Sequence, residues 1–479
     1  MKHKLTWSLM PVALAVCAAF PAPAMADTTQ DLLNELRALK ARVGELEKKI
    51  EAQAGKSAEA PVAAAPGMTP EQQQDFNRIA VKTEAMEDAR DALGFKGLKV
   101  SGYMDPTFIY NQRQDQAGFQ FLNAVSDGGY TYDNSYIGMA LIDFTKETDS
   151  GTRWRLTLAP QRSTQAVAEG GVSPVHEASV SIPLTDLQTR FIAGHIPDWS
   201  GYEYLPATQN KLITHNLLFD LTLPTAYTGA GLELAREKWL IKGVFANMNG
   251  SKRNAREKTP VFAYRVDYAK GEFQGFGFAG VHGKASNGAA FDDNGDPALN
   301  QVTSEPFSTR DSRVDLFEFD AYFIRGDWTV QGQLSWGRQQ KASITPDPDT
   351  GALRDAYWSG LSALVAYKFE PRLEGVARID YIANRKNGGG LLTYAAADDH
   401  NGIGPAQTDA DGDTVIDSPG KGVNRSALTL GLNYAFNLNT TFKIEYRYDW
   451  ASGPVFLDTK SDTYKKSNQL LGTSVVVSF

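Results

Sequence analysis

The feature that most constrains the fold of this chain is a strict two-residue alternation between Asn424 and Trp450. Apolar side chains fill every second position on two arms, and a turn of a few residues after Phe436 joins the arms. Successive side chains of a strand point to opposite faces, so one face of this hairpin is apolar and the other is charged. The charged row is Lys443, Glu445, Arg447 and Asp449. A soluble amphipathic hairpin gives the same pattern, but a strand between lipid and water requires it.

The alternation recurs from Lys96 onward and predicts sixteen strands. Their connections alternate between links of a few residues and long loops, as in an up-and-down membrane barrel, whereas sandwiches use Greek-key links. We therefore expect an all-β, sixteen-stranded antiparallel transmembrane barrel over residues 95–479. The predicted strands are 97–110, 132–146, 152–162, 174–184, 187–196, 227–236, 238–249, 259–270, 273–284, 312–325, 327–340, 355–369, 372–386, 422–436, 440–452 and 466–479.

Hydropathy and charge exclude two classes of protein. Mean hydropathy is -0.34, and after the first 20-odd residues no run of about 18 apolar residues occurs, which excludes a helical membrane protein. The chain has 48 Lys and Arg against 56 Asp and Glu, a net charge of -8. This balance argues against a nucleic-acid partner.

Residues 1–26 are typical of a secretory signal. Lys2 and Lys4 precede an apolar stretch from Leu9 to Phe20, and Ala24-Met25-Ala26 is a cleavage site. The alternative is a lipoprotein lipidated at Cys17, the only cysteine of the chain. Removal of the signal would take away Lys2 and Lys4, leaving a cysteine-free chain of net charge -10.

Three segments are expected between the signal and the barrel. Residues 27–51 contain a heptad seam that predicts a short coiled coil, as an annex to an oligomer held together elsewhere. An amphipathic helix packed on its own domain is the alternative. Residues 52–68 are rich in Ala and Pro and indicate a linker. Residues 69–94 predict a helix, with Thr69 as N-cap and Gly94 as the stop signal, that lies under or in the mouth of the barrel.

The architecture resembles the general porins of Gram-negative outer membranes. Phe479 ends a strand whose same face carries Val477, Val475, Thr473 and Leu471, which resembles the signal read by the outer-membrane assembly machinery. Lys99-Val100-Ser101-Gly102-Tyr103 is similar to the first strand of many porins, and the coiled coil resembles the trimeric DcaP-like and phosphate-selective groups. Residues 216–231, with Thr228-Gly229, are similar to a region of OmpL-like porins. The resemblance implies a homotrimer in the outer membrane of a Gram-negative bacterium, in contact with membrane lipid and lipopolysaccharide, with a periplasmic N-terminal segment.

If the outward faces are apolar, the charged residues between them line a lumen. A basic wall on early strands facing acidic or mixed walls on later strands would set up a transverse field. The alternative is that the wall charges pair with one another. The candidate pore-lining residues are Arg153, Arg155, Arg190, Arg265, Asp267, Glu318, Asp320, Arg378, Asp380, Lys443, Glu445 and Arg447.

The long loop 197–226 is expected to fold inward and narrow the channel opposite Arg153, Arg155 and Arg190. Its aromatic and aliphatic content indicates an ordered loop, with Glu203, Lys211 and His215 as its polar contacts. The alternative is an external cap at a trimer interface. The function predicted is a passive diffusion channel for small hydrophilic, charged solutes; a plugged barrel that acts through its loops is the alternative.

Metal binding and catalysis have weaker sequence signals. Asp409, Asp411, Asp413 and Asp417 could hold a structural calcium ion, and no other cofactor is expected. No nucleophile elbow, zinc-binding helix or phosphate loop occurs, so we expect no enzyme. An outer-membrane hydrolase with a dispersed serine and histidine pair is the last alternative.

Overall fold

The computed structural model describes residues 82, 96–122, 137–163, 173–249, 260–285, 299–300, 302–306, 312–343, 346–347, 349–384, 403–408, 417–418 and 420–479. The chain divides into two compact units, Met1–Ala89 and Arg90–Phe479. The predicted signal, coiled coil, linker and following helix lie outside the described residues, except for the helical residue Lys82. In the part of the chain that the structure describes, no helix has the length and apolarity needed to cross a membrane.

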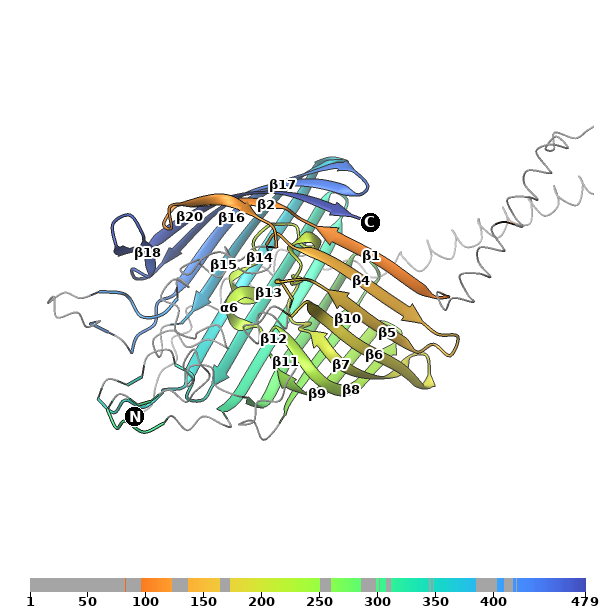
Figure 1. Cartoon of the computed structure of the whole chain (residues 1–479), viewed down its shortest axis with the longest axis horizontal. Coiled ribbons are helices and arrows are strands. Elements are labelled where there is room, and N and C mark those ends of the chain that lie inside the picture. The colour runs from red at the N-terminus through yellow and green to blue at the C-terminus, as the bar shows by residue number, and fades with distance from the viewer. Residues whose placement is uncertain are drawn as a thin grey trace, which may run out of the picture. The chain divides into compact units, whose positions relative to one another are not determined.

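Antiparallel strands of the second unit close into a barrel (Figure 1). The strands are β1 (Leu98–Met104), β2 (Thr107–Asn111), β3 (Gln116–Gln120), β4 (Ala140–Glu147), β5 (Arg153–Leu158), β6 (Val175–Asp186), β7 (Thr189–Pro197), β8 (Ala226–Arg236), β9 (Trp239–Met248), β10 (Val261–Ala269), β11 (Gln274–Ala285), β12 (Ser312–Arg325), β13 (Trp328–Gln339), β14 (Ala356–Glu370), β15 (Leu373–Ala383), β16 (Arg425–Asn437), β17 (Thr440–Ala451) and β20 (Ser467–Ser478). The other elements are the 3₁₀ turn η1 (Ala207–Gln209), the helix α6 (Leu217–Thr222) and the small hairpin β18 (Phe456–Asp458) and β19 (Thr463–Lys465).

The barrel has sixteen strand positions. Each strand from β4 to β17 pairs with the next, and β20 then pairs with β17 on one side and with β1 and β2 on the other. Tyr103 opposes Ser478 and Thr107 opposes Ser474 across this seam. Pairing of β20 with β1 and β2 closes the ring of described strands, while β3 pairs with β2 alone. The predicted sixteen-stranded barrel is therefore confirmed.

Two strand positions are interrupted. Pro106, which has no N–H to donate, separates β1 from β2 in the first position. The second position is filled by β3 opposite β2 and by β4 opposite β1. The prediction of one strand over 132–146, preceded by a loop over 111–131, is therefore wrong. Residues 116–120 pair directly with β2 through a tight turn, but their weak apolar alternation hid this strand in the sequence.

The connections sort by length to the two ends of the barrel (Figure 1). Glu237 and Gly326, both with positive φ, stand in short turns at one end. We call this the short-turn end, and the opposite one the long-loop end. The predicted alternation of short and long connections is present in the order of the strands.

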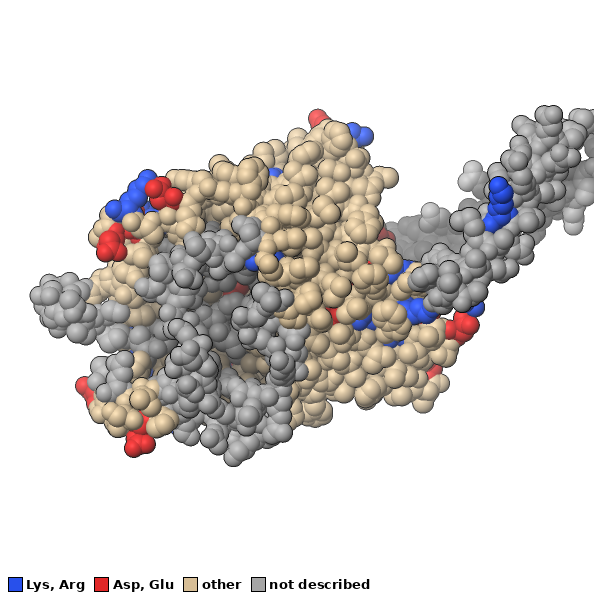
Figure 2. Space-filling view, viewed as in Figure 1, with Lys and Arg blue, Asp and Glu red and all other residues tan. Residues whose placement is uncertain are grey.

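The outer surface is apolar between these ends. Phe245, Leu430 and Ile444 point outward and are 64%, 48% and 51% exposed. Figure 2 shows a flank of the barrel that is largely free of charged side chains. Aromatic pairs lie near both ends, such as Trp239 with Tyr268 at ring centroids 4.8 Å apart and Phe245 with Phe262 at 5.1 Å. An apolar band between two aromatic girdles matches the two interfaces of a bilayer.

Candidate functional site

The cross-strand register determines which side chains share the inner face of the barrel. Arg378 opposes Thr429, and Thr429 opposes Arg447, so all three point to the same side. The same reasoning around the ring places every predicted wall residue on the inner face. Whether these residues line a conducting pore stays a prediction. They are Arg153, Arg155, Arg190, Arg265, Asp267, Glu318, Asp320, Arg378, Asp380, Lys443, Glu445 and Arg447.

The segment between β7 and β8, residues 198–225, runs inside the barrel; we call it the inner loop. It contains η1 and α6 (Figure 1). Asn216 caps α6, because its side-chain oxygen accepts a hydrogen bond from Phe219 N at 2.8 Å. Leu217, Leu218 and Leu221 of the helix pack into the main apolar cluster of the barrel. The inner loop is therefore an ordered part of the interior.

Glu445 holds the backbone of the inner loop. Its carboxylate accepts hydrogen bonds from Ile213 N at 2.5 Å, from Thr214 N at 3.1 Å and from the Thr214 hydroxyl. Beside it, Lys443 Nζ donates to the carbonyl oxygens of Ala207, at 3.1 Å, and Asn210. Burial of the Glu445 carboxylate and the Lys443 ammonium is possible here because both groups form hydrogen bonds with backbone groups of the inner loop.

Two buried arginines hold the next turn of the inner loop. Arg378 donates from Nη1 to Glu203 Oε1 at 2.7 Å and from Nη2 to the His215 carbonyl at 2.8 Å. Arg447 donates to the same carbonyl at 2.8 Å, and its Nε lies 3.0 Å from Asp449 Oδ2. These arginines are at most 1% exposed. Removal of one partner would leave an uncompensated buried charge, which costs about 3–5 kcal/mol.

Further contacts extend the anchoring over β13 to β15, and Asn433 of β16 donates to the Lys211 carbonyl at 2.8 Å. The Tyr202 hydroxyl lies 2.6 Å from Ser362 Oγ, which donates to Asp380 at 2.6 Å. Lys211 pairs with Glu374 at 2.6 Å, and Thr222 Oγ1 lies 3.2 Å from Ser335 Oγ. One half of the inner wall is thus covered by the inner loop.

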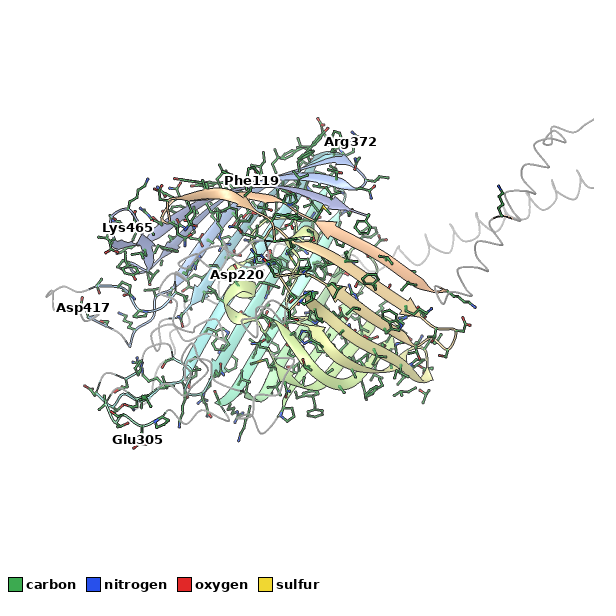
Figure 3. The ribbon with its side chains drawn as sticks, viewed as in Figure 1. Phe119, Asp220, Glu305, Arg372, Asp417 and Lys465 are labelled. Atoms are coloured by element: carbon green, nitrogen blue, oxygen red, sulfur yellow. The ribbon has the colours of Figure 1, made fainter. Side chains whose placement is uncertain are left out.

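Burial shifts the titration of groups in the inner loop. It raises the pKa of Glu203 to about 7, although Arg378 opposes the shift. Burial also raises the pKa of Asp220 and lowers that of His215. His215 Nδ1 lies 4.0 Å from Asp220 Oδ1, and neither carboxylate oxygen of Asp220 has a hydrogen-bond partner among the described residues. Figure 3 shows Asp220 on α6.

The other half of the inner wall borders a cavity of about 390 Å³, which we call the lumen cavity. It lies along β1 and β4 to β9, and Trp199 of the inner loop forms part of its lining. The charged residues that line it include Lys99, Arg153, Arg155, Glu177, Glu233 and Lys242. The open space is thus bounded on one side by the inner loop and on the other by Arg153 and Arg155.

The charges of the inner wall are largely paired. Arg153 lies 3.0 Å from Glu147, Arg155 lies 2.8 Å from Asp143, and Lys242 lies 3.3 Å from Glu233. On later strands Arg265 pairs with both Asp267, at 2.7 Å, and Asp320. Arg190 donates instead to Ser181 Oγ and to the Gly151 carbonyl, at 2.6 and 2.7 Å. The geometry thus favours the alternative of paired wall charges over an unbalanced basic wall.

Lys99 differs from the paired charges that line the lumen cavity. Its side chain is exposed, and it has no ion pair with any described residue. The sequence reasoning did not single it out as a wall residue. Its position between outward Leu98 and Val100 was the signal that could have identified it.

Sequence reasoning found part of the anchoring of the inner loop. Glu203 and Lys211 contact the wall, and His215 does so through its backbone carbonyl. Its ring Nε2 lies 2.8 Å from the Tyr204 carbonyl, within the loop. Thr214 and Asn216 were missed, because threonine and asparagine in a loop carry no charge signal. The Asn-Leu-Leu-Phe sequence, an N-cap before an apolar run, could have revealed α6.

The predicted calcium loop is only partly described. Asp417 is exposed and lies among the long loops (Figure 3), whereas Asp409, Asp411 and Asp413 lie outside the described residues. Among the residues with described positions, no group of three potential ligands could hold a metal ion. Calcium binding by this loop stays a prediction.

Comparisons with known proteins find solved structures that are similar to this chain at low sequence identity. No curated protein matches the chain in sequence. An anion-selective porin from Comamonas acidovorans is 9% identical, with a TM-score of 0.48 over 80% of this chain and 99% of that one. The outer membrane channel DcaP of Acinetobacter baumannii has the same identity, TM-score and coverage of this chain, and 97% of it is covered. OmpT of Vibrio cholerae, an outer-membrane protein, is 10% identical with a TM-score of 0.48, covering 80% of this chain and 97% of that one.

One family model covers the whole sequence. It is described as "Protein of unknown function (DUF3138)" and matches residues 1–479. The chain belongs to this family.

Proposed function

We propose that this barrel is a passive diffusion channel for small hydrophilic, charged solutes. The observation that carries the proposal is the division of the lumen. The inner loop is fastened to β13–β17 by buried polar contacts, and a cavity with a charged lining is left beside β1 and β4–β9. Such an arrangement narrows a water-filled barrel without sealing it, and it selects solutes by size.

The charges of the lumen cavity favour hydrated solutes over apolar ones. Arg153, Arg155 and Lys242 alternate with Glu147, Glu177 and Glu233 around the cavity. Paired charges keep the wall hydrated and give only a weak preference for one sign of charge. Lys99 supplies the net bias, toward anions.

The proposal includes a location and an assembly. The apolar band and its aromatic girdles support insertion in the outer membrane, with Phe479 as the signal for the assembly machinery. The N-terminal segment is proposed to be periplasmic and its coiled coil to join three copies. We propose no enzymatic activity.

Crosslinking of the full chain in membranes tests the proposed trimer. We expect a ladder of crosslinked species that ends at three copies, and the presence of monomers alone would refute the trimer.

Liposome swelling tests the channel. Vesicles that contain the purified chain should swell in small neutral sugars, at a rate that falls steeply with the size of the sugar. A shortened inner loop lacking residues 207–222 should admit larger sugars. Vesicles that stay sealed, with the barrel shown to be folded and inserted, would favour the plugged barrel instead.

A further inference from the structure

A cluster of charged side chains lies on the outer face of the barrel, outside the lumen, at the long-loop end of β11–β14. Phe262, His282, Asp315 and Arg338 are cross-strand neighbours in one row, so they share the outward face. Lys284 and Arg313 face each other in the next row toward the loops. We use the name headgroup cluster for six side chains: His282, Lys284, Arg313, Asp315, Arg338 and Asp355.

The headgroup cluster directly follows apolar surface. Phe317 and Trp336 stand two positions nearer the middle of β12 and β13, on the same face, and are 41% and 50% exposed. His282 stacks on Tyr264 with ring centroids 5.7 Å apart. A charged row beyond an aromatic row is the position of lipid headgroups at a membrane surface.

The carboxylates of the headgroup cluster orient its cations. Asp315 lies 3.1 Å from His282 Nδ1 and accepts from Arg313 Nε at 3.0 Å. Asp355 accepts from Arg338 Nη2 at 2.7 Å, and the Arg338 guanidinium lies over the Tyr357 ring at 5.1 Å. Each guanidinium is therefore held in place by one of its donors.

Several donors of the cluster are left unused. Both Nη atoms of Arg313 lack a hydrogen bond to any described residue, and its side chain is 64% exposed. Arg338 Nε is buried and has no acceptor in the part of the chain that the structure describes. Lys284 is exposed and has no ion pair within the described ranges. Among the described side chains of the cluster, Lys284, Arg313 and Arg338 face two carboxylates, which leaves one positive charge without counting His282.

We propose that the headgroup cluster binds the phosphate group of an anionic lipid in the leaflet at the long-loop end. Guanidinium groups match phosphate oxygens in geometry and charge, while Phe317 and Trp336 would contact the acyl chains below. This inference rests on the membrane placement proposed above but not on conduction, because the cluster lies outside the lumen.

The test compares lipid retention by the full chain and its variants. The chain is placed in phosphatidylcholine nanodiscs that contain a small share of phosphorylated lipid A, and native mass spectrometry counts the retained lipid. Arg313→Gln with Arg338→Gln should weaken retention roughly 30-fold, given the usual contribution of each cation near an anionic surface. Arg325→Gln is the matched control, since Arg325 lies on the outer face of the same strand at the opposite end, and it should retain lipid as the unmodified chain does.

Three outcomes would overturn the proposal. The double variant could retain lipid A as the unmodified chain does, or the control could lose it equally. Inorganic phosphate at millimolar concentration could displace lipid A completely, which would mark a site for free phosphate. Conductance of the double variant should be unchanged. If the unmodified chain shows no conductance in a planar bilayer, this result contradicts the proposed channel but does not affect the lipid-binding result.

Discussion

At the scale of single residues, the distinctive feature is a set of charged side chains that are buried and have hydrogen-bond or ion-pair partners. Glu445, Arg447 and Asp449 alternate on β17 with outward aromatic and aliphatic residues, and each is at most 1% exposed. Their partners are mostly backbone groups of the inner loop or neighbouring charges. The row that looks like lumen wall in the sequence thus acts in large part as an anchor.

Glu445→Gln should release the inner loop, because an amide cannot accept the three hydrogen bonds that Glu445 accepts from Ile213 and Thr214. A cysteine at Thr208, whose buried hydroxyl has no hydrogen bond to any described residue, can report this release through labelling by a water-soluble maleimide. We expect labelling to accelerate roughly 100-fold, as the loss of a buried charged anchor implies.

Glu374→Gln is the control for this experiment. Glu374 pairs with Lys211, whose side chain is 27% exposed, so water can replace the lost contact and the acceleration should be small. Equal labelling rates in the Glu445 and Glu374 variants would contradict the anchoring role of Glu445.

Lys99→Glu should shift ion preference toward cations, because Lys99 is exposed, lines the lumen cavity and has no ion pair with any residue whose position is described. The reversal potential in a salt gradient should show a change of roughly threefold in the permeability ratio, as expected for two charge units in hydrated surroundings. Lys96→Glu is the control, since Lys96 does not line the cavity and pairs with Asp149. Identical shifts in both variants would refute a specific role of Lys99.

At the scale of elements, the inner loop combines a rigid anchor with titratable groups. Glu203 accepts from Arg378 and from Asn216 N, the residue that caps α6. Asp220 of α6 faces His215, which stacks on Phe219 at ring centroids 4.2 Å apart. The helix and its anchor therefore share one buried cluster with Asp380, Arg447 and Arg378.

The position of the inner loop should depend on pH. The pKa of Glu203 is about 7 in the folded chain, above the ordinary value of a glutamate. Docking of the inner loop against the wall therefore takes up a proton, and docking is strongest at a pH below the ordinary pKa of glutamate. It weakens as pH rises through about 7. Conductance should therefore increase between about pH 5 and pH 8, and Glu203→Gln should flatten this increase. An unaltered pH profile in that variant would assign the dependence to other groups.

At the scale of the whole molecule, alternation in the sequence was enough to predict the barrel, its number of strands and the faces of its charges. Outward side chains form the apolar surface and inward side chains face the lumen or the inner loop, so the two-residue period recurs at nearly every strand position. The interrupted second strand escaped prediction because Gln116–Gln120 lacks this period. The anchoring of the inner loop escaped because its partners lie more than 160 residues apart and involve backbone groups.

Leu430→Arg tests the assignment of the outer face. Leu430 is 48% exposed on the outward side of β16, and a charge in mid-membrane costs about 2–4 kcal/mol. The variant should insert poorly or unfold at lower denaturant concentration in bilayers. Ser101→Arg, on the inner face opposite Asp143, should leave stability in the bilayer nearly unchanged. The reverse order of stability would mean that the faces are assigned wrongly.

Single-channel recording in a planar bilayer is the most direct test of the loop-narrowed lumen. The unmodified chain should give discrete, stable conductance steps, and removal of residues 207–222 should enlarge each step while the barrel stays folded. A folded and inserted barrel without conductance, or steps of unchanged size after removal of the loop, would contradict the proposed channel.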